Sequence, residues 1–182
     1  MKSSPLKTLA IFTLLLLCSK GWCQSDLQII DKKVNFGYHP ATNRSITNII
    51  IHSVFNNMGG EKYDIDLVIK QFAIYRVSSH YVIARDGCIY RLTDESNVAF
   101  HAGKSKLPNG KSNINSTSIG IEILTSFDES PTDLQITALV KLVKALKKRY
   151  PIEFILRHSD IAPDRKTDPW NMDWEAFIKQ VQ

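Results

Sequence analysis

The stretch 46-ITNIIIHSV-54 is the feature that most restricts how this chain can fold. It is almost entirely apolar and rich in β-branched residues, which is typical of a strand buried on both of its faces. Such a strand needs a sheet that is covered by other elements on either side. The runs 118-SIGIEIL-124 and 152-IEFILRH-158 predict two further strands. We therefore expect an α/β protein.

Three segments carry the pattern of amphipathic helices. In residues 63–76 and 130–150, apolar side chains recur at helical spacing, and residues 173–181 form a shorter segment of the same kind. Ser130 is the predicted N-cap of the longest helix. The positions expected to face the core are Ile65, Val68, Phe72, Tyr75, Leu134, Ala138, Leu139, Leu142, Val143, Leu146, Trp174 and Phe177.

Turn and loop residues complete the expected architecture. Two alternating runs flank Asp86-Gly87, a dipeptide that favours a tight β-hairpin. Residues 102–117 are rich in Gly, Ser, Asn and Lys, which predicts a long loop. The 182 residues show no internal repeat and no interdomain linker. The prediction is one domain with a central mixed β-sheet flanked by helices.

The N-terminal segment has the pattern of a secretory signal peptide. Lys2 and Lys7 precede the apolar run 8–18, which is too short to span a bilayer comfortably. The small residues Gly21 and Cys23 then suit cleavage directly after position 23. We expect the protein to be exported, either to the periplasm or out of the cell.

The signal peptide sets the expected domain boundaries. Residues 1–23 would be removed, residues 24–45 are polar and turn-rich and would form an N-terminal arm, and residues 46–182 would form the catalytic domain. A lipoprotein signal, with Cys18 or Cys23 at the new N-terminus, is the alternative. The large residue before each of these cysteines disfavours it, and only lipidation would bring the protein to a membrane.

Charge and cysteine content narrow the partners. The net charge of +5 is mild, and the one basic cluster, Lys144, Lys147, Lys148 and Arg149, lies near a predicted helix end, where cations complement the helix dipole. No nucleic-acid partner is therefore predicted. Cleavage leaves Cys88 as the remaining cysteine, so we expect a half-buried free thiol and no internal disulfide.

Two histidines share a position that favours ligand binding. His52 and His158 each follow the apolar residues of a predicted strand, and the carboxyl ends of strands are where open α/β sheets bind ligands. Asp168 lies ten residues after His158, in a loop framed by Pro163 and Pro169. Two imidazoles and a carboxylate would leave a tetrahedral Zn²⁺ one open position, as in catalytic zinc sites. The pattern predicts such a site.

Two charged residues could complete that site. Glu122, on the predicted strand 118–124, could transfer protons as a general acid/base. Lys166, two residues before Asp168, could polarise a scissile carbonyl. The alternatives are histidines that only pack and hydrogen-bond, a solvent-facing Glu122 and a surface Lys166.

The segment 158-HSDIAPDRKTDP-169 resembles the signature of the zinc-dependent N-acetylmuramoyl-L-alanine amidases of the second amidase type. This family shares its fold with the peptidoglycan recognition proteins. The resemblance continues in the same order through 50-IIHSV-54, 76-RVSSHYVIARDG-87, 99-AFHAG-103, 118-SIGIEI-123 and Asp173-Trp174. It implies His52, His158 and Asp168 as zinc ligands, with Glu122 as acid/base and Lys166 as catalytic lysine.

The resemblance also implies a reaction and a substrate. The expected activity is hydrolysis of the amide between N-acetylmuramic acid, in its ordinary or 1,6-anhydro form, and L-alanine of peptidoglycan stem peptides, for cell-wall degradation or recycling. Arg76 matches a substrate-pocket arginine, with a helix-end salt bridge as the alternative. Phe100 and His101 are expected to line the substrate cleft, and His80 to be buried and hydrogen-bonded. The expected partner is peptidoglycan or a muropeptide, and we expect a monomer.

This chain departs at several positions from the anhydromuramyl-peptide amidases of the family, so its own sugar preference stays open. Ser53, Phe100 and Trp170-Asn171 replace residues that are usual there, and all lie at the expected sugar and peptide walls. Three other functions remain in view. They are a binding module without zinc, a metal-free hydrolase with His52 and His158 as an acid–base pair, and a zinc peptidase that cuts within the stem peptide.

Overall fold

The apolar run that opens the sequence argument becomes strand β3 (Asn48–Val54), an interior strand of the main sheet. A computed structural model describes residues 27–182, so the predicted signal peptide lies outside the described residues. Ile49, Ile50 and Ile51 are all 0% exposed. Both faces of β3 are therefore covered, as its composition predicts.

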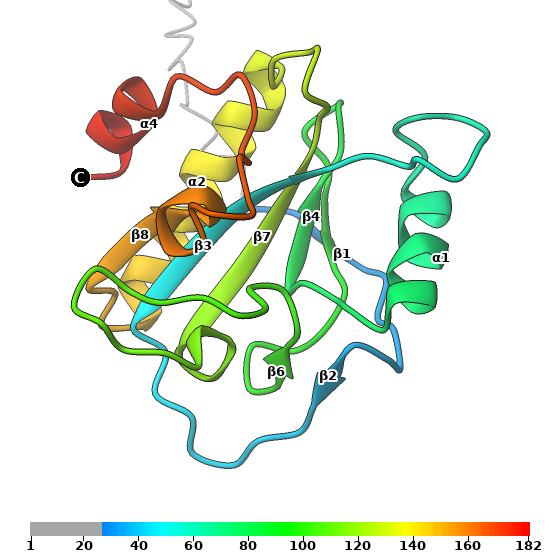
Figure 1. The fold of residues 1–182 in the computed structure, drawn as a ribbon. Helices are drawn as coiled ribbons and strands as arrows, with labels where there is room; N and C mark the ends of the chain where they lie inside the picture. Colours follow the sequence, from blue (N-terminus) through cyan, green and yellow to red (C-terminus); the bar gives the residue numbers. More distant parts are fainter. Residues whose placement is uncertain (1–26) are drawn as a thin grey trace, which may run out of the picture.

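Six strands form the main sheet, in the order β1-β5-β4-β7-β3-β8 (Figure 1). The parallel pairs include β3 with β7 and β3 with β8, whereas β4 and β5 form the antiparallel hairpin predicted at Asp86-Gly87. The prediction of one mixed sheet flanked by helices is confirmed. The bounds are β1 Ile29–Asp31, β4 Tyr81–Ile83, β5 Ile89–Arg91, β7 Ser118–Leu124 and β8 Phe154–Arg157.

One face of the sheet is covered by α2 (Asp133–Arg149) and α4 (Trp174–Val181). The predicted N-cap of α2, Ser130, is wrong, because Thr132 takes that position and forms a capping box with Gln135. Leu134, predicted to face the core, is 60% exposed, because the first turn of α2 lies against the hairpin turn instead of the sheet. No helix within residues 27–182 has both the length and the apolarity to cross a bilayer.

The opposite face is covered by α1 (Ile65–Tyr75) and by the segment 100–117, which ends in the 3₁₀ helix η1 (Ile114–Thr117). Val68 and Phe72 of α1 are buried as predicted, but Tyr75 is 59% exposed. The apolar stripe is shorter than the sequence suggested, because α1 ends at Tyr75 and the next residue turns the chain away. This face, less fully covered by helices, carries the candidate site.

The N-terminal arm is more than the lead-in that its polar composition suggested. Its β1 adds an edge strand beside β5, and its β2 (Tyr38–His39) pairs with β6 (Val98–Ala99) in a second, two-stranded sheet. Arg44 donates hydrogen bonds to the backbone carbonyls of Glu95 (3.1 Å) and Asn115 (3.2 Å). The structural unit therefore begins well before residue 46.

Candidate metal centre

Strand register places three of the predicted site residues in a row. His52 of β3 pairs with Glu122 of β7 on one side. On the other side, β8 pairs Ile51 with Arg157, so His158 follows directly beside His52. His158 then opens the short helix α3 (His158–Ile161), a helical turn that the sequence analysis did not predict. The Nδ1 atoms of the two histidines lie 2.9 Å apart.

Asp168 closes the cluster from the loop after α3. Its Oδ2 lies 3.1 Å from His158 Nδ1 and 3.6 Å from His52 Nδ1, and it accepts a hydrogen bond from the Ser53 backbone N–H (3.3 Å). The Ser159 N–H donates to the Asp168 carbonyl (2.9 Å), which fixes the backbone of the returning loop. Donor atoms of the three predicted ligands thus lie within 4.8 Å of one another, and all three side chains are buried.

The chemistry of this donor set fits a divalent cation. The Nε2 of His158 faces the Ala102 carbonyl (3.3 Å), which can only accept, so in the neutral form of the ring that nitrogen carries the proton and Nδ1 keeps a free lone pair. Burial lowers the pKa of His52 to about 4, although the nearby Asp168 carboxylate opposes the shift, so this imidazole is neutral at neutral pH. The cluster could therefore bind a metal through two neutral imidazoles and one carboxylate.

Asp168 supplies the negative charge of the set. Burial alone would raise its pKa, but the close approach of its Oδ2 to the His158 and His52 rings holds the pKa well below its ordinary value. The carboxylate therefore stays ionised across the physiological range, although it is buried. A buried anion beside two lone-pair donors is the electrostatic environment that a cation requires.

Glu122 is a carboxyl group in a different electrostatic state. It lies on the same face as His52 and is 8% exposed. Burial, together with the negative charge of Asp168, raises its pKa to about 8, and the Lys166 ammonium opposes that rise. A carboxyl group with that pKa exchanges protons near neutral pH, which is the property of a general acid/base.

Lys166 enters the site on the loop that carries Asp168. Its backbone N–H donates to the Ala162 carbonyl (3.0 Å). The neighbouring Arg165 ties the loop across the site, because it donates to the carbonyls of Ala102 (2.6 Å) and Lys104 (2.9 Å). The segment that carries Lys166 is therefore hydrogen-bonded both to the end of α3, at Ala162, and to the segment 102–104 across the site.

A cavity of about 340 Å³ opens above the cluster and is lined by all three predicted ligands, Glu122 and Lys166. Phe100 and His101 also line it, as the sequence predicts. Arg76 is not among the lining residues. It is the exposed C-cap of α1, in the left-handed conformation that ends the helix, and it makes no ion pair within the described part of the chain. Neither the pocket role nor the salt-bridge alternative for Arg76 is seen.

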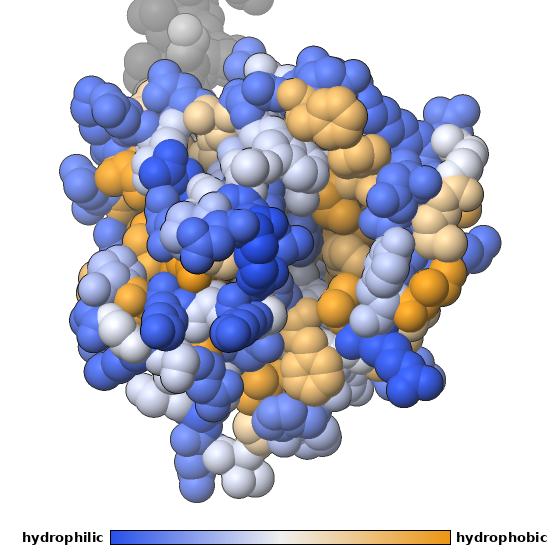
Figure 2. Space-filling view, viewed as in Figure 1, coloured by the Kyte–Doolittle hydropathy of each residue, from blue (hydrophilic) through white to orange (hydrophobic). Residues whose placement is uncertain are grey.

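Trp170, which the sequence analysis placed at a wall of the cleft, is joined there by two aromatic residues that it did not predict. Trp170 lines the cavity, and its ring lies 5.9 Å from that of Phe55 and 6.3 Å from that of Phe127 between centroids. Phe127 is 67% exposed. Figure 2 shows apolar side chains beside a hollow on this face of the molecule. The three residues are far apart in sequence, so only the loop arrangement brings them together.

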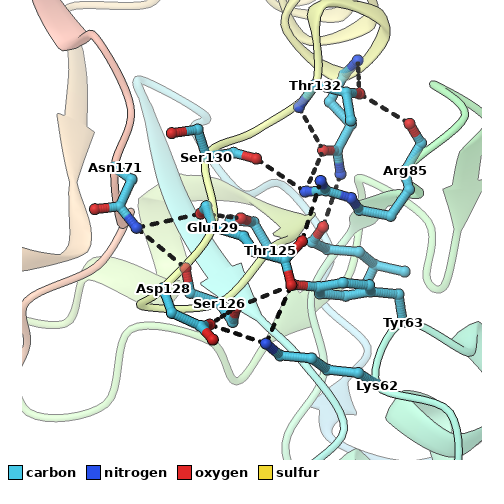
Figure 3. A network of polar contacts seen from close by, with 12 residues as sticks. Lys62, Tyr63, Arg85, Thr125, Ser126, Asp128, Glu129, Ser130, Thr132 and Asn171 are labelled. Atoms are coloured by element: carbon cyan, nitrogen blue, oxygen red, sulfur yellow. Dashed lines mark hydrogen bonds and ion pairs between the residues drawn. The ribbon is translucent and has the colours of Figure 1, made fainter.

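A polar network holds the loop that carries Phe127 (Figure 3). Asn171 donates to the carbonyl of Phe127 (2.9 Å), and Arg85 donates to that of Ser130 (3.0 Å). Lys62 forms an ion pair with Asp128 (2.9 Å). Exposed ion pairs contribute little stability, so the bonds to backbone carbonyls are the ones that fix the loop. Because Asn171 directly follows Trp170, its bond to the Phe127 carbonyl links the two loops that carry Trp170 and Phe127.

Comparison with known proteins identifies related sequences. A family model described as N-acetylmuramoyl-L-alanine amidase matches residues 42–171. The 1,6-anhydro-N-acetylmuramyl-L-alanine amidase AmpD of Haemophilus influenzae is 37% identical over 111 residues, which is 59% of this chain and 60% of AmpD. The match therefore spans about 60% of the length of that curated relative.

Solved structures show the same fold. The crystal structure of a selenomethionine derivative of AmpD aligns with a TM-score of 0.66 and 30% identity, covering 82% of this chain and 93% of that one. The Escherichia coli amidase AmiD, in complex with the substrate anhydro-N-acetylmuramic acid-L-Ala-D-γ-Glu-L-Lys, aligns with a TM-score of 0.66 and 30% identity. That alignment covers 77% of this chain and 59% of AmiD.

Proposed function

This chain belongs to the N-acetylmuramoyl-L-alanine amidase family, and from that membership we propose that it hydrolyses the amide bond between N-acetylmuramic acid and the L-alanine of peptidoglycan stem peptides. The observation that carries the proposal is the convergence of His52, His158 and Asp168 at the base of one cavity, beside Glu122. Structures of related amidases with bound muramyl peptides support a muropeptide as the substrate class.

The proposed metal is Zn²⁺, held by His52, His158 and Asp168. When bound, zinc supplies a Lewis acid that polarises the scissile carbonyl and makes a water molecule more acidic. Glu122 would take a proton from the attacking water and return it to the leaving nitrogen as the C–N bond breaks. The Lys166 ammonium would stabilise the negative charge that develops on the carbonyl oxygen.

The cavity walls fit a substrate with both sugar and peptide parts. Phe100 and Trp170 offer aromatic surface, and Ser53, Ser78 and Thr167 offer polar groups in the same cavity. The departures at Ser53, Phe100 and Trp170 thus all lie on the walls. We propose that they tune the choice between ordinary and 1,6-anhydro muramyl residues without altering the metal ligands.

Export is part of the proposal. The charged, apolar and small-residue regions of residues 1–23 support cleavage of a signal peptide and a periplasmic or secreted site of action. Fractionation of cells followed by N-terminal sequencing checks this. A mature chain that starts at Gln24 outside the cytoplasm is expected, and an uncleaved cytoplasmic chain would contradict it.

Mass spectrometry of the products from a defined muropeptide mixture tests the reaction itself. We expect intact stem peptides that begin with L-alanine, together with the free muramyl sugar. Fragments cut inside the stem would instead identify a peptidase. Hydrolysis that survives a chelator would identify a metal-free hydrolase, and zinc-free protein that binds muropeptides unchanged would identify a recognition module.

A further inference from the structure

A line of hydrogen bonds runs away from the metal cluster through His52. The Nε2 atom of His52 lies 2.9 Å from Nδ1 of His101. The Nε2 atom of His101 lies 3.0 Å from the Ser118 hydroxyl oxygen, and that hydroxyl lies 2.7 Å from the Ile114 carbonyl oxygen. The line joins β3, the loop after β6, the start of β7 and η1.

The final group of this line determines the direction of every bond in it. The Ile114 carbonyl can only accept, so the Ser118 hydroxyl donates to it and is left as an acceptor for His101. His101 then carries its proton on Nε2 and has a free lone pair on Nδ1. That lone pair accepts from His52 Nε2–H, which leaves the Nδ1 of His52 without a proton.

We propose that His101 and Ser118 are positioning residues that fix the tautomer of His52, so that its Nδ1 lone pair is presented to the metal. The inference rests on the proposed metal site, and it gives His101 a task beyond lining the cleft. Outer-shell partners of this kind orient ligand histidines and strengthen metal binding in many sites.

The placement of the His101 ring supports this role. A Cβ atom at Gly120 would lie 2.5 Å from the ring, so the glycine provides the space that the ring occupies. Asn115 Oδ1 accepts from the backbone N–H groups of both His101 (3.2 Å) and Ala102 (2.8 Å). The Ala102 carbonyl also faces the Nε2 of His158. The adjacent residues His101 and Ala102 thus fix the ring tautomers of the two ligand histidines, His52 and His158.

Loss of the Ser118 hydroxyl should reverse the direction of the hydrogen bond between His101 and His52. His101 would then be free to carry its proton on Nδ1 and donate it to His52 Nε2. His52 would in turn protonate its Nδ1, the atom that faces His158 and Asp168. The metal would have to displace that proton, so zinc affinity should fall.

Zinc affinity, measured by competition with a chelator and zinc chloride alone, tests the proposal in three variants. Ser118→Ala and His101→Leu should weaken zinc binding by about 10-fold or more, the range for a lost outer partner. His101→Asn keeps an acceptor where Nδ1 was and should stay within about threefold of the wild type. Equal losses in the Leu and Asn variants, or none in Ser118→Ala, would overturn the proposal.

A spectroscopic readout of the histidine rings does not depend on activity. Two-bond ¹H–¹⁵N correlation spectra of the protein labelled at histidine report which ring nitrogen carries the proton. His101 should be the Nε2–H tautomer in the wild type and should shift towards Nδ1–H in Ser118→Ala. A wild-type His101 protonated on Nδ1 would refute the assignment. Zinc binding with the expected tautomer but no amidase activity would instead refute only the proposed function.

Discussion

At the scale of single residues, the site depends on two carboxyl groups held in opposite protonation states. Asp168 remains ionised beside two histidines, whereas burial raises the pKa of Glu122 to about 8. The sequence predicted both residues by type and position, but it gave no information on their burial. Only the register of β7 against β3 shows that Glu122 is shielded on the same face as His52.

Replacing Glu122 by Gln tests its proton transfer. Glutamine keeps the size of the side chain but cannot exchange a proton, so kcat should fall by about 100-fold or more. Bound zinc per chain should be unchanged, because Glu122 is not one of the clustered ligand residues. Full activity in Glu122→Gln would remove the general acid/base role, and loss of zinc would show that the residue supports the metal instead.

His80 makes a separate prediction about stability. Burial, together with the positive charge of Arg44, lowers its pKa to about 3. In the unfolded chain His80 has the ordinary pKa of 6.5. Between pH 6.5 and 3 the unfolded chain therefore binds one more proton at His80 than the folded chain does. The contribution of His80 should therefore lower the folded-to-unfolded ratio by about tenfold for each pH unit of acidification in that window.

The matched control is His80→Asn. Asparagine can keep the acceptor that receives the Gly120 N–H (3.0 Å) but does not titrate. Urea unfolding of metal-free protein at several pH values should give a shallower pH dependence for the variant than for the wild type. Identical slopes would mean that His80 gains a proton in the folded state as readily as in the unfolded chain.

At the scale of elements, apolar periodicity predicted the long strands and the helices, and it failed where pairing involves few residues. The strands β1 and β2 span three and two residues of mixed polarity, which is too few to show a period. They are held by backbone pairing to β5 and β6, segments distant in the sequence. The start of α2 was misplaced because both Ser130 and Thr132 are suitable N-cap residues.

The capping box of α2 can be tested by paired substitutions. The Thr132 hydroxyl accepts from the Gln135 N–H (3.1 Å), so Thr132→Ala should lower the free energy of unfolding by about 1 kcal/mol. Ser130→Ala is the matched control and should change it by less than about 0.5 kcal/mol, as for an ordinary surface substitution. Chemical denaturation measures both, and equal effects would contradict the assigned cap.

At the scale of the whole molecule, the site is a product of strand order. Glu122, His52 and His158 lie in a row because β7 and β8 flank β3 on opposite sides. The sequence predicted that histidines at strand ends could meet, but it could not show which strands are neighbours. The approach of Asp168 depends in addition on a loop whose course is set by long-range bonds such as those of Arg165.

A crystal structure of the zinc-loaded protein, with anomalous data collected on both sides of the zinc absorption edge, tests the central claim most directly. We predict one strong zinc peak in contact with His52, His158 and Asp168, and no such peak at that position in His52→Ala. A zinc ion bound elsewhere, or a peak that one of the three side chains does not contact, would contradict the assignment of the metal centre.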